Sequence, residues 1–224
     1  NKIIESLPEN KKSFLVNKAS YNEDLTNARN AIKKLSKYEI RKEEIERQKK
    51  ILKSKTDEVS KKALRKLQNF ETAGVVDFTH IILPDYGIRL LQIAPLLPFY
   101  DIDPKKVQLI GTGVWDDKVF FSDPTLQGSI FPGVVEKKRN EYFNQYLINY
   151  KNKPIRTITI PYDLVGIISY VIDSKMNLKK VYQILDNGNI QFDGIDGKFL
   201  FKNNIISRDL KMLRIVNGSA ILNK

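Results

Sequence analysis

The amino-terminal part of the chain contains a periodic apolar segment that follows a short continuous apolar run. In residues 21–35 the apolar residues are spaced by four and three positions, which predicts a helix. Ser20 lies just before this segment and Glu23 lies three residues after Ser20, the arrangement of a helix-capping pair. The preceding run, KSFLVN at residues 12–17, is short and continuously apolar at its centre. It predicts a buried strand.

Further strands and helices alternate through the middle of the chain. Residues 75–84, VVDFTHIILP, predict a second strand, and a helix is expected from Tyr86 to Leu97, closed by Pro98. Residues 107–111, VQLIG, predict a third strand, and residues 128–135, GSIFPGVV, a fourth. Strands separated by helices predict parallel crossovers and an α/β fold with an open sheet covered on both faces.

The carboxyl-terminal part predicts a helix pair and two hairpins. Residues 161–173, PYDLVGIISYVID, are apolar on nearly all sides and predict a buried helix. The next segment, NLKKVYQIL, predicts a second helix capped by Asn177. FDGIDGKFLF predicts a hairpin, and LKMLRIVNGSAIL predicts two strands joined at Asn217 and Gly218.

One strongly charged segment interrupts this pattern. Residues 37–71 mix Lys and Arg with Glu around a narrow apolar stripe, and a break near Ser54 and Asp57 predicts two exposed helices. Residues 1–70 contain 19 Lys or Arg and 10 Asp or Glu, so this part carries most of the net charge of +12. Such a segment is usually a solvated face, and the alternatives are a nucleic-acid surface or a protein partner. No aromatic residues are interleaved to stack bases, which argues against nucleic acid.

The predicted sheet places a candidate site at the carboxyl ends of its strands, where ligands bind in open α/β folds. The turns there supply aromatic, hydroxyl and carboxylate groups, from Tyr21, Asp85, Tyr86, Thr112 and Trp115. Each also has a plain structural alternative. Asp85 is placed to cap the helix that follows it, and Tyr21 and Trp115 are suited to packing.

These junctions resemble a known family. KKSFLVNKASYNEDLTNARNAIKKL, DFTHIILPDYGIRLLQIAPLLPFYDI, VQLIGTGVWDD and FDGIDGKFLFKNNIISRDLKMLRIVNGSAI are similar to type 1 periplasmic binding proteins, specifically the Leu/Ile/Val-binding-like and penicillin-binding protein activator branch. The resemblance implies two α/β lobes that close over a ligand, and it begins at the second lobe. We therefore expect residues 1–150 to form one α/β lobe with the charged insertion at 37–71. Residues 151–224 are expected to return to a first lobe that is mostly missing.

The resemblance also implies where a ligand binds. The family's ligand-facing corner falls on Tyr21 and Asn22, its second-strand turn on Asp85 and Tyr86, and its third-strand turn on Thr112 to Trp115. Amino-acid receptors of this fold place an acid in the third turn to hold the ligand ammonium, whereas GTGVW has none before Asp116. This departure favours a protein-binding role.

Two functions follow as expectations from the resemblance. The first is a non-catalytic regulator that binds a peptidoglycan synthase. The alternative is a solute receptor that delivers a branched-chain amino acid, or a related small molecule, to the membrane subunits of an ABC importer. Both imply a periplasmic location, with a lipid anchor on a leader outside this chain as a further expectation.

Composition excludes several other classes. The chain has no Cys and a single His, His80, which lies in an apolar strand and is expected to be a core residue. Disulfides and thiolate metal sites are therefore excluded, and no second His completes a metal site. The GTG motif lacks the third glycine of a phosphate-binding turn, and the isolated serines do not lie in a nucleophile-elbow sequence. We predict no enzyme activity, no cofactor, no nucleic-acid partner and no membrane span.

Overall fold

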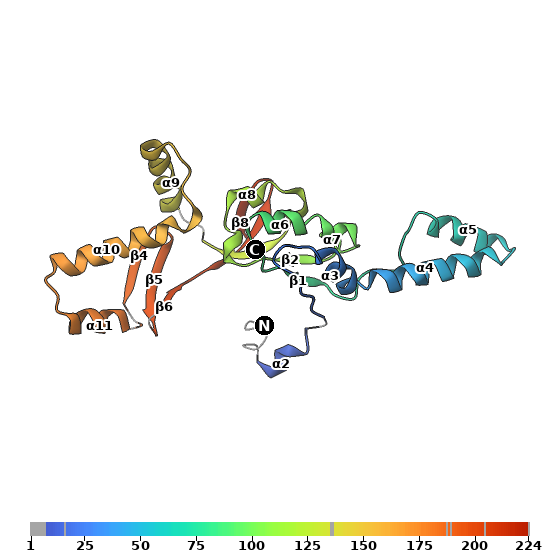
Figure 1. Cartoon of the computed structure of the whole chain (residues 1–224), viewed down its shortest axis with the longest axis horizontal. Helices are drawn as coiled ribbons and strands as arrows, with labels where there is room; N and C mark the ends of the chain where they lie inside the picture. The colour runs from blue at the N-terminus through green and yellow to red at the C-terminus, as the bar shows by residue number, and fades with distance from the viewer. Residues whose placement is uncertain are drawn as a thin grey trace. The chain divides into compact units, whose positions relative to one another are not determined.

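The computed structural model describes residues 8–15, 17–134, 137–186, 188, 190–203 and 205–223 (Figure 1). The chain divides into two compact units. The first consists of residues 1–110 and 123–128, and the second of residues 111–122 and 129–224. The boundary expected at residue 150 stays a prediction. The larger sheet has the strand order β1-β2-β3-β7-β8, and a second sheet has the order β4-β5-β6. The predicted α/β class, an open sheet containing parallel strands and flanked by helices, is confirmed.

The first unit contains a parallel strand pair and α-helices of 4 to 16 residues. Its elements are α2 (Glu9–Lys12), α3 (Ala28–Leu35), α4 (Tyr38–Lys53), α5 (Glu58–Leu67), β1 (His80–Ile82), α6 (Gly87–Ile93), α7 (Leu96–Phe99), β2 (Gln108–Ile110) and η2 (Pro124–Leu126). In β1 and β2, His80 pairs with Gln108 and Ile82 with Ile110. The core residues Leu90, Ile93 and Leu109 are almost completely buried.

The strand predicted at residues 12–17 is wrong within the described residues. α2 ends at Lys12, residues 13–15 are exposed with Phe14 81% accessible, and Val16 lies outside the described residues. A short apolar run becomes a strand only where another strand is available to satisfy its backbone groups, and among the described pairings β1 is paired with β2.

The next helix begins later than predicted. α3 starts at Ala28 because a polar turn occupies the positions before it. The side chain of Asn27 accepts a hydrogen bond from the Asn22 backbone N–H at 2.7 Å, and Leu25 has a left-handed φ of 61°. Such side chain–backbone bonds compete with helix formation, so the proposed cap by Ser20 and Glu23 is wrong.

The helix predicted from Tyr86 to Leu97 is divided in two. α6 ends at Ile93, and Pro95 precedes the short helix α7, which itself contains Pro98. Proline has no backbone N–H to donate a hydrogen bond to the preceding turn. The break therefore falls at the first proline of the segment. The predicted strands on either side are correct in position but shorter than expected.

The charged segment forms two helices, as predicted, and they pack together as a hairpin. α4 and α5 run beside each other in the first unit, and this hairpin, which we call the arm, consists of residues 38–67 (Figure 1). The break falls where predicted, but Asp57 caps α5 by accepting the Ser60 N–H at 2.8 Å, while Ser54 ends α4. Ile45 is buried, and Arg41 at the base of the arm bonds to the carbonyl oxygen of Ala73 at 3.0 Å.

The second unit contains antiparallel strands and α-helices of 4 to 15 residues. Its elements are η1 (Gly113–Trp115), α8 (Lys118–Phe121), β3 (Ile130–Gly133), α9 (Lys137–Tyr150), η3 (Arg156–Ile158), α10 (Thr159–Asp173), α11 (Leu178–Asp186), β4 (Gln191–Gly194), β5 (Gly197–Lys202), β6 (Ile205–Arg208), β7 (Lys211–Val216) and β8 (Ser219–Leu222). The predicted fourth strand is β3, although Val135 lies outside the described residues. β3 pairs antiparallel with β7, which departs from the all-parallel expectation.

The two carboxyl-terminal hairpins are confirmed. β4 and β5 pair antiparallel, and β7 and β8 pair through Asn217 and Gly218. Both turn residues have positive φ, 49° and 79°, which is the conformation that a two-residue hairpin turn of this type requires. β6, which pairs with β5, was not predicted.

The helix pair is also confirmed, but α10 is not buried. Asn177 caps α11 by accepting the Lys180 N–H at 2.9 Å. In α10, the apolar residues Val165, Ile168 and Ile172 are 61%, 57% and 67% exposed. A helix that is apolar on all sides is buried only if neighbours cover every side, and the three-stranded sheet β4–β6 can cover one side of α10.

Candidate functional site

Two of the predicted site residues meet after β1, in the first unit. The hydroxyl of Tyr21 donates a hydrogen bond to the carboxylate of Asp85. Asp85 is 7% exposed, and its Oδ1 lies 3.1 Å from Nε of Arg89, one helical turn further on. The Arg89 Nε–H is not aligned for a hydrogen bond, so this contact is an ion pair. The carboxylate is therefore already engaged by groups of the chain itself.

The electrostatics of this cluster keep Tyr21 protonated. Burial raises the pKa of the Tyr21 hydroxyl, and the hydrogen bond to Asp85 and its negative charge raise that pKa further. The phenol therefore remains a donor to the carboxylate at all ordinary pH values. The N-cap residue of α6 is Tyr86 rather than Asp85, so the alternative role of Asp85 as the helix cap is wrong.

Tyr86 is the exposed member of the predicted site. Its side chain is 64% accessible, and the next residue, Gly87, has a φ of 58°, a conformation that glycine adopts without strain. Position 87 therefore suits the turn from β1 into α6. An exposed aromatic ring at a strand end is the type of surface that a ligand or partner contacts.

The turn after β2 lies in the second unit and is built around Trp115. Its ring is fully buried and packs on Gly111, where an added Cβ would lie 2.1 Å from the ring. Gly111 is therefore needed to admit the tryptophan, and Thr112 is half-buried beside it. A ligand-binding role for Thr112 and Trp115, and a cleft shared by all five candidate residues, stay predictions.

A group of four charges, three of them buried and one partly buried, lies in the second unit, and we call it the ion quartet. It consists of Asp116 after η1, Arg139 in α9, Arg156 in η3 and Asp196 in the β4–β5 turn. Arg139 Nη1 and Arg156 Nη2 lie 2.7 Å and 3.0 Å from Asp116 Oδ2. Arg156 Nη1 lies 2.8 Å from Asp196 Oδ2, which also accepts the Thr159 hydroxyl at 2.6 Å.

The quartet is closed and electrically balanced. Arg139 Nε lies 2.9 Å from Asp196 Oδ1, although this pair is not aligned as a hydrogen bond. Burial raises the pKa of Asp196, but the Thr159 hydroxyl and the positive charges of Arg156 and Arg139 outweigh it and hold that pKa below its usual value. Burial lowers the pKa of Arg156, and the two carboxylates more than reverse this. Asp196 and Arg156 therefore remain charged near neutral pH.

No pattern in the sequence indicated the quartet. Consecutive members are separated by 17 to 40 positions, and in the sequence Asp116 stands out only as the first acid after GTGVW. The two adjacent carboxylates diverge, as expected of neighbouring residues, because Asp117 accepts the Val119 N–H at 3.1 Å and caps α8. Arg89, which neutralises Asp85, was also missed, although a spacing of four residues in a helix is a recognisable ion-pair pattern.

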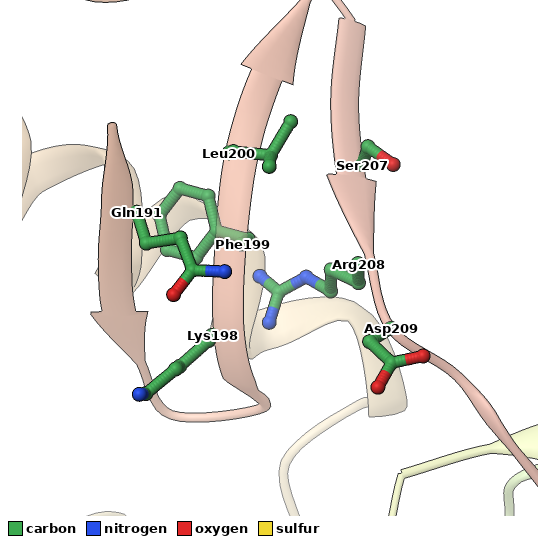
Figure 2. A pocket seen from close by; sticks show the side chains of 7 residues that line it. All are labelled: Gln191, Lys198, Phe199, Leu200, Ser207, Arg208 and Asp209. Atoms are coloured by element: carbon green, nitrogen blue, oxygen red, sulfur yellow. The ribbon is translucent and has the colours of Figure 1, made fainter. Parts of the chain in front are cut away.

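A shallow hollow of about 390 Å³ lies over the β4–β6 sheet (Figure 2). Arg208 stacks on the Phe199 ring at 4.9 Å and pairs with Asp163 of α10 at 2.9 Å. The lining residues are Gln191, Lys198, Phe199, Leu200, Ser207, Arg208 and Asp209. The mixture of both charge signs gives the hollow no single chemical preference.

His80 does not have the expected core position. Its side chain is exposed at the start of β1, and Nδ1 lies 2.8 Å from the hydroxyl of Thr79. Strand residues alternate between the two faces, so one apolar run can still expose individual members. Among the described residues, no three His, Asp or Glu side chains are grouped to hold a metal ion.

Comparison with known proteins gives a likeness in fold. No family model matches the chain, and no curated protein matches it. An extracellular ligand binding receptor from Desulfohalobium retbaense DSM5692 is similar in structure, with 16% sequence identity and a TM-score of 0.51. The similar region covers 66% of this chain and 27% of the receptor, so this chain spans about a quarter of that protein.

Two other solved structures are more distant. The solute binding protein of an ABC transporter from Rhodopseudomonas palustris BisB5, in complex with 3,4-dihydroxy benzoic acid, is 12% identical over 63% of this chain and 42% of that one, with a TM-score of 0.48. The C-domain of LpoA (YraM) from Haemophilus influenzae, a regulator of PBP1A, is 8% identical over 75% and 59%, with a TM-score of 0.41. At these values neither carries weight.

These findings define a class of fold and no more. Over the part that matches, the chain has a fold similar to that of the extracellular ligand binding receptor, in line with the resemblance noted in the sequence motifs. In the part of the chain that the structure describes, every helix is too short or too polar to cross a membrane.

Proposed function

We propose that this module is a non-catalytic regulator that binds a peptidoglycan synthase in the periplasm. The observation that carries the proposal is the state of Asp85, the carboxylate in the predicted ligand-binding turns. It is buried and engaged by Tyr21 and Arg89. An amino-acid ligand would have to displace Arg89 and leave it unpaired, which is costly for a partly buried charge.

The acid that follows the third turn supports the same conclusion. Asp116 is the first carboxylate after GTGVW, and it belongs to the ion quartet, where Arg139 and Arg156 both contact it. It is therefore engaged within its own unit. A protein partner requires no free carboxylate, and the exposed apolar residues of α10 are the kind of surface that protein partners bury.

The second candidate is a receptor for a small solute. The fold likeness to an extracellular ligand binding receptor favours it, as does the exposed ring of Tyr86 at the predicted site. The synthase as partner rests on the sequence resemblance to penicillin-binding protein activators.

Direct binding measurements separate the two functions. We expect a purified peptidoglycan synthase to bind the immobilised chain, and leucine, isoleucine and valine to leave its melting temperature unchanged, because only ligands that prefer the folded state raise it. Tyr86→Ala should leave synthase binding within about twofold. Micromolar binding of an amino acid that is lost in Tyr86→Ala, with no synthase binding, would establish the receptor instead.

A further inference from the structure

The arm carries a surface of unpaired positive charge that the sequence did not reveal. Residues 37–71 contain 12 Lys or Arg and 7 Asp or Glu, which suggests a mixed surface. The structure shows that most of the acids are used within the arm and its base. Glu44 pairs with Arg47, Glu46 with Lys49 and Glu58 with Lys61.

The remaining acids of the segment are also mostly engaged. Glu39 pairs with Lys33, Asp57 caps α5, and Glu71 accepts the hydroxyl of Tyr38. Among the described residues, Glu43 alone of these acids has no such partner. By contrast, seven exposed cations of the segment make no ion pair with a described residue. They are Lys42, Lys50, Lys53, Lys55, Lys62, Arg65 and Lys66.

The unpaired cations share a helix face with an exposed apolar residue. Val59, Lys62 and Lys66 are spaced by three and four in α5, so they lie side by side on one face. Val59 is 79% exposed, whereas Ser60, about 100° further around the helix, is buried. Lys50 and Lys53 are three positions apart in α4, so they also lie side by side on one helix face. Lys55 follows in the turn after α4.

The chemistry of this surface suits one kind of partner. Six of the seven cations are Lys, which acts as a hydrated point charge rather than as the planar fork with which Arg pairs with individual phosphates or carboxylates. The arm has no exposed aromatic ring within α4 or α5 to stack on bases. A Lys-rich helix with an exposed aliphatic side chain is typical of contact with a negatively charged lipid surface.

We propose that the arm binds the surface of an anionic lipid bilayer, with the Val59, Lys62 and Lys66 face of α5 turned towards the headgroups. The unpaired lysines supply the attraction, and Val59 enters the boundary between headgroups and acyl chains. This proposal does not depend on whether the module binds a peptidoglycan synthase, and it therefore goes beyond the proposed function.

Vesicle sedimentation of the full chain tests the proposal. We expect the chain to pellet with vesicles that contain phosphatidylglycerol and to remain in solution with pure phosphatidylcholine vesicles. Raising the salt concentration to about 0.3 M should release most of it, because screening weakens exposed charge interactions. Equal binding to both kinds of vesicle, or no binding to either, would overturn the proposal.

Variants identify the face. Replacing both lysines, as Lys62→Gln with Lys66→Gln, should lower the partition coefficient about 30-fold, since each lysine near an anionic membrane contributes about fivefold. Val59→Asp should lower it as well. The matched control is Lys179→Gln with Lys180→Gln in α11, which changes the net charge equally and should alter binding by less than about twofold.

A soluble polyanion distinguishes a membrane from a polymer partner. Circular dichroism first establishes that each variant is folded. If a single-stranded oligonucleotide or polyglutamate competes fully with vesicles at equal charge, and Val59→Asp binds vesicles as the wild type does, the arm is a site for an acidic polymer and the proposal is wrong. Loss of binding in the α11 control equal to that in α5 would also contradict it.

Discussion

The arm and the ion quartet use the same residue types for opposite purposes. In the arm, the Glu58 and Lys61 side chains pair at 2.9 Å while 84% and 50% exposed. In the quartet, Arg139 and Asp116 pair at 2.7 Å while 9% and 6% exposed. Water screens the first pair, so it contributes little to stability. The second pair is removed from water, so each charge depends on its partners.

The comparison shows that counting charged residues along a sequence says little about what they do. The segment at 37–71 has the highest density of charge, yet its pairs can be lost at small cost. The four members of the quartet are spread along the chain and connect η1, α9, η3 and the β4–β5 turn of the second unit. Their burial, rather than their number, gives them their importance.

The largest expected effect comes from breaking the quartet. Asp196→Asn keeps the side-chain volume but leaves Arg139 and Arg156 with an uncompensated buried charge, so we expect a loss of about 3–5 kcal/mol in the free energy of unfolding. Urea denaturation followed by circular dichroism measures it. The control is Asp117→Asn, a helix cap beside the quartet, for which less than about 0.5 kcal/mol is expected because Asn and Asp cap helices about equally well. Equal losses in the two variants would show that the quartet is no more important than a surface cap.

Acid should remove the same contribution in the wild type. The pKa of Asp196 is lowered on folding, so its contribution to stability is fully present above its ordinary value of 3.8 and is lost as the pH falls through the lower folded pKa. The stability difference between wild type and Asp196→Asn should therefore be constant from neutral pH to about pH 5 and shrink below pH 3.8. A difference that disappears already near neutral pH would contradict the lowered pKa.

The arm should depend on its apolar contacts more than on its charges. Ile45 is 1% exposed in α4, and Ile45→Ala should cost about 2–4 kcal/mol in the stability of the arm. Amide hydrogen exchange of residues 38–67 measures this locally. Ile40→Ala, at a position in the same helix that is 67% exposed, is the control and should leave exchange almost unchanged.

The smallest effect is expected for an exposed pair. Glu58→Gln removes the partner of Lys61 and should change the free energy of unfolding by less than about 0.5 kcal/mol, because the pair is screened by water. Urea midpoints of the variant and the wild type provide the measurement. A loss as large as that of Asp196→Asn would remove the distinction between the arm and the quartet.

The features that the sequence predicted correctly are local ones. The hairpin at Asn217 and Gly218 follows from two adjacent residues that accept positive φ, and the cap at Asn177 follows from a side chain that reaches the next turn. The break in the arm was predicted for the same reason, although the capping residue is Asp57. Each depends on contacts between residues a few positions apart.

Tertiary structure alone decided the pairing and the burial. An apolar run does not specify its partner, so KSFLVN formed no strand in its described residues and β3 paired antiparallel with β7. The apolar pattern of α10 was equally uninformative about which of its sides a neighbour would cover. The ion quartet and the engagement of Asp85 by Tyr21 join residues between 23 and 64 positions apart. Such contacts form only when the folded chain brings distant segments together, and for that reason no local pattern in the sequence encodes them.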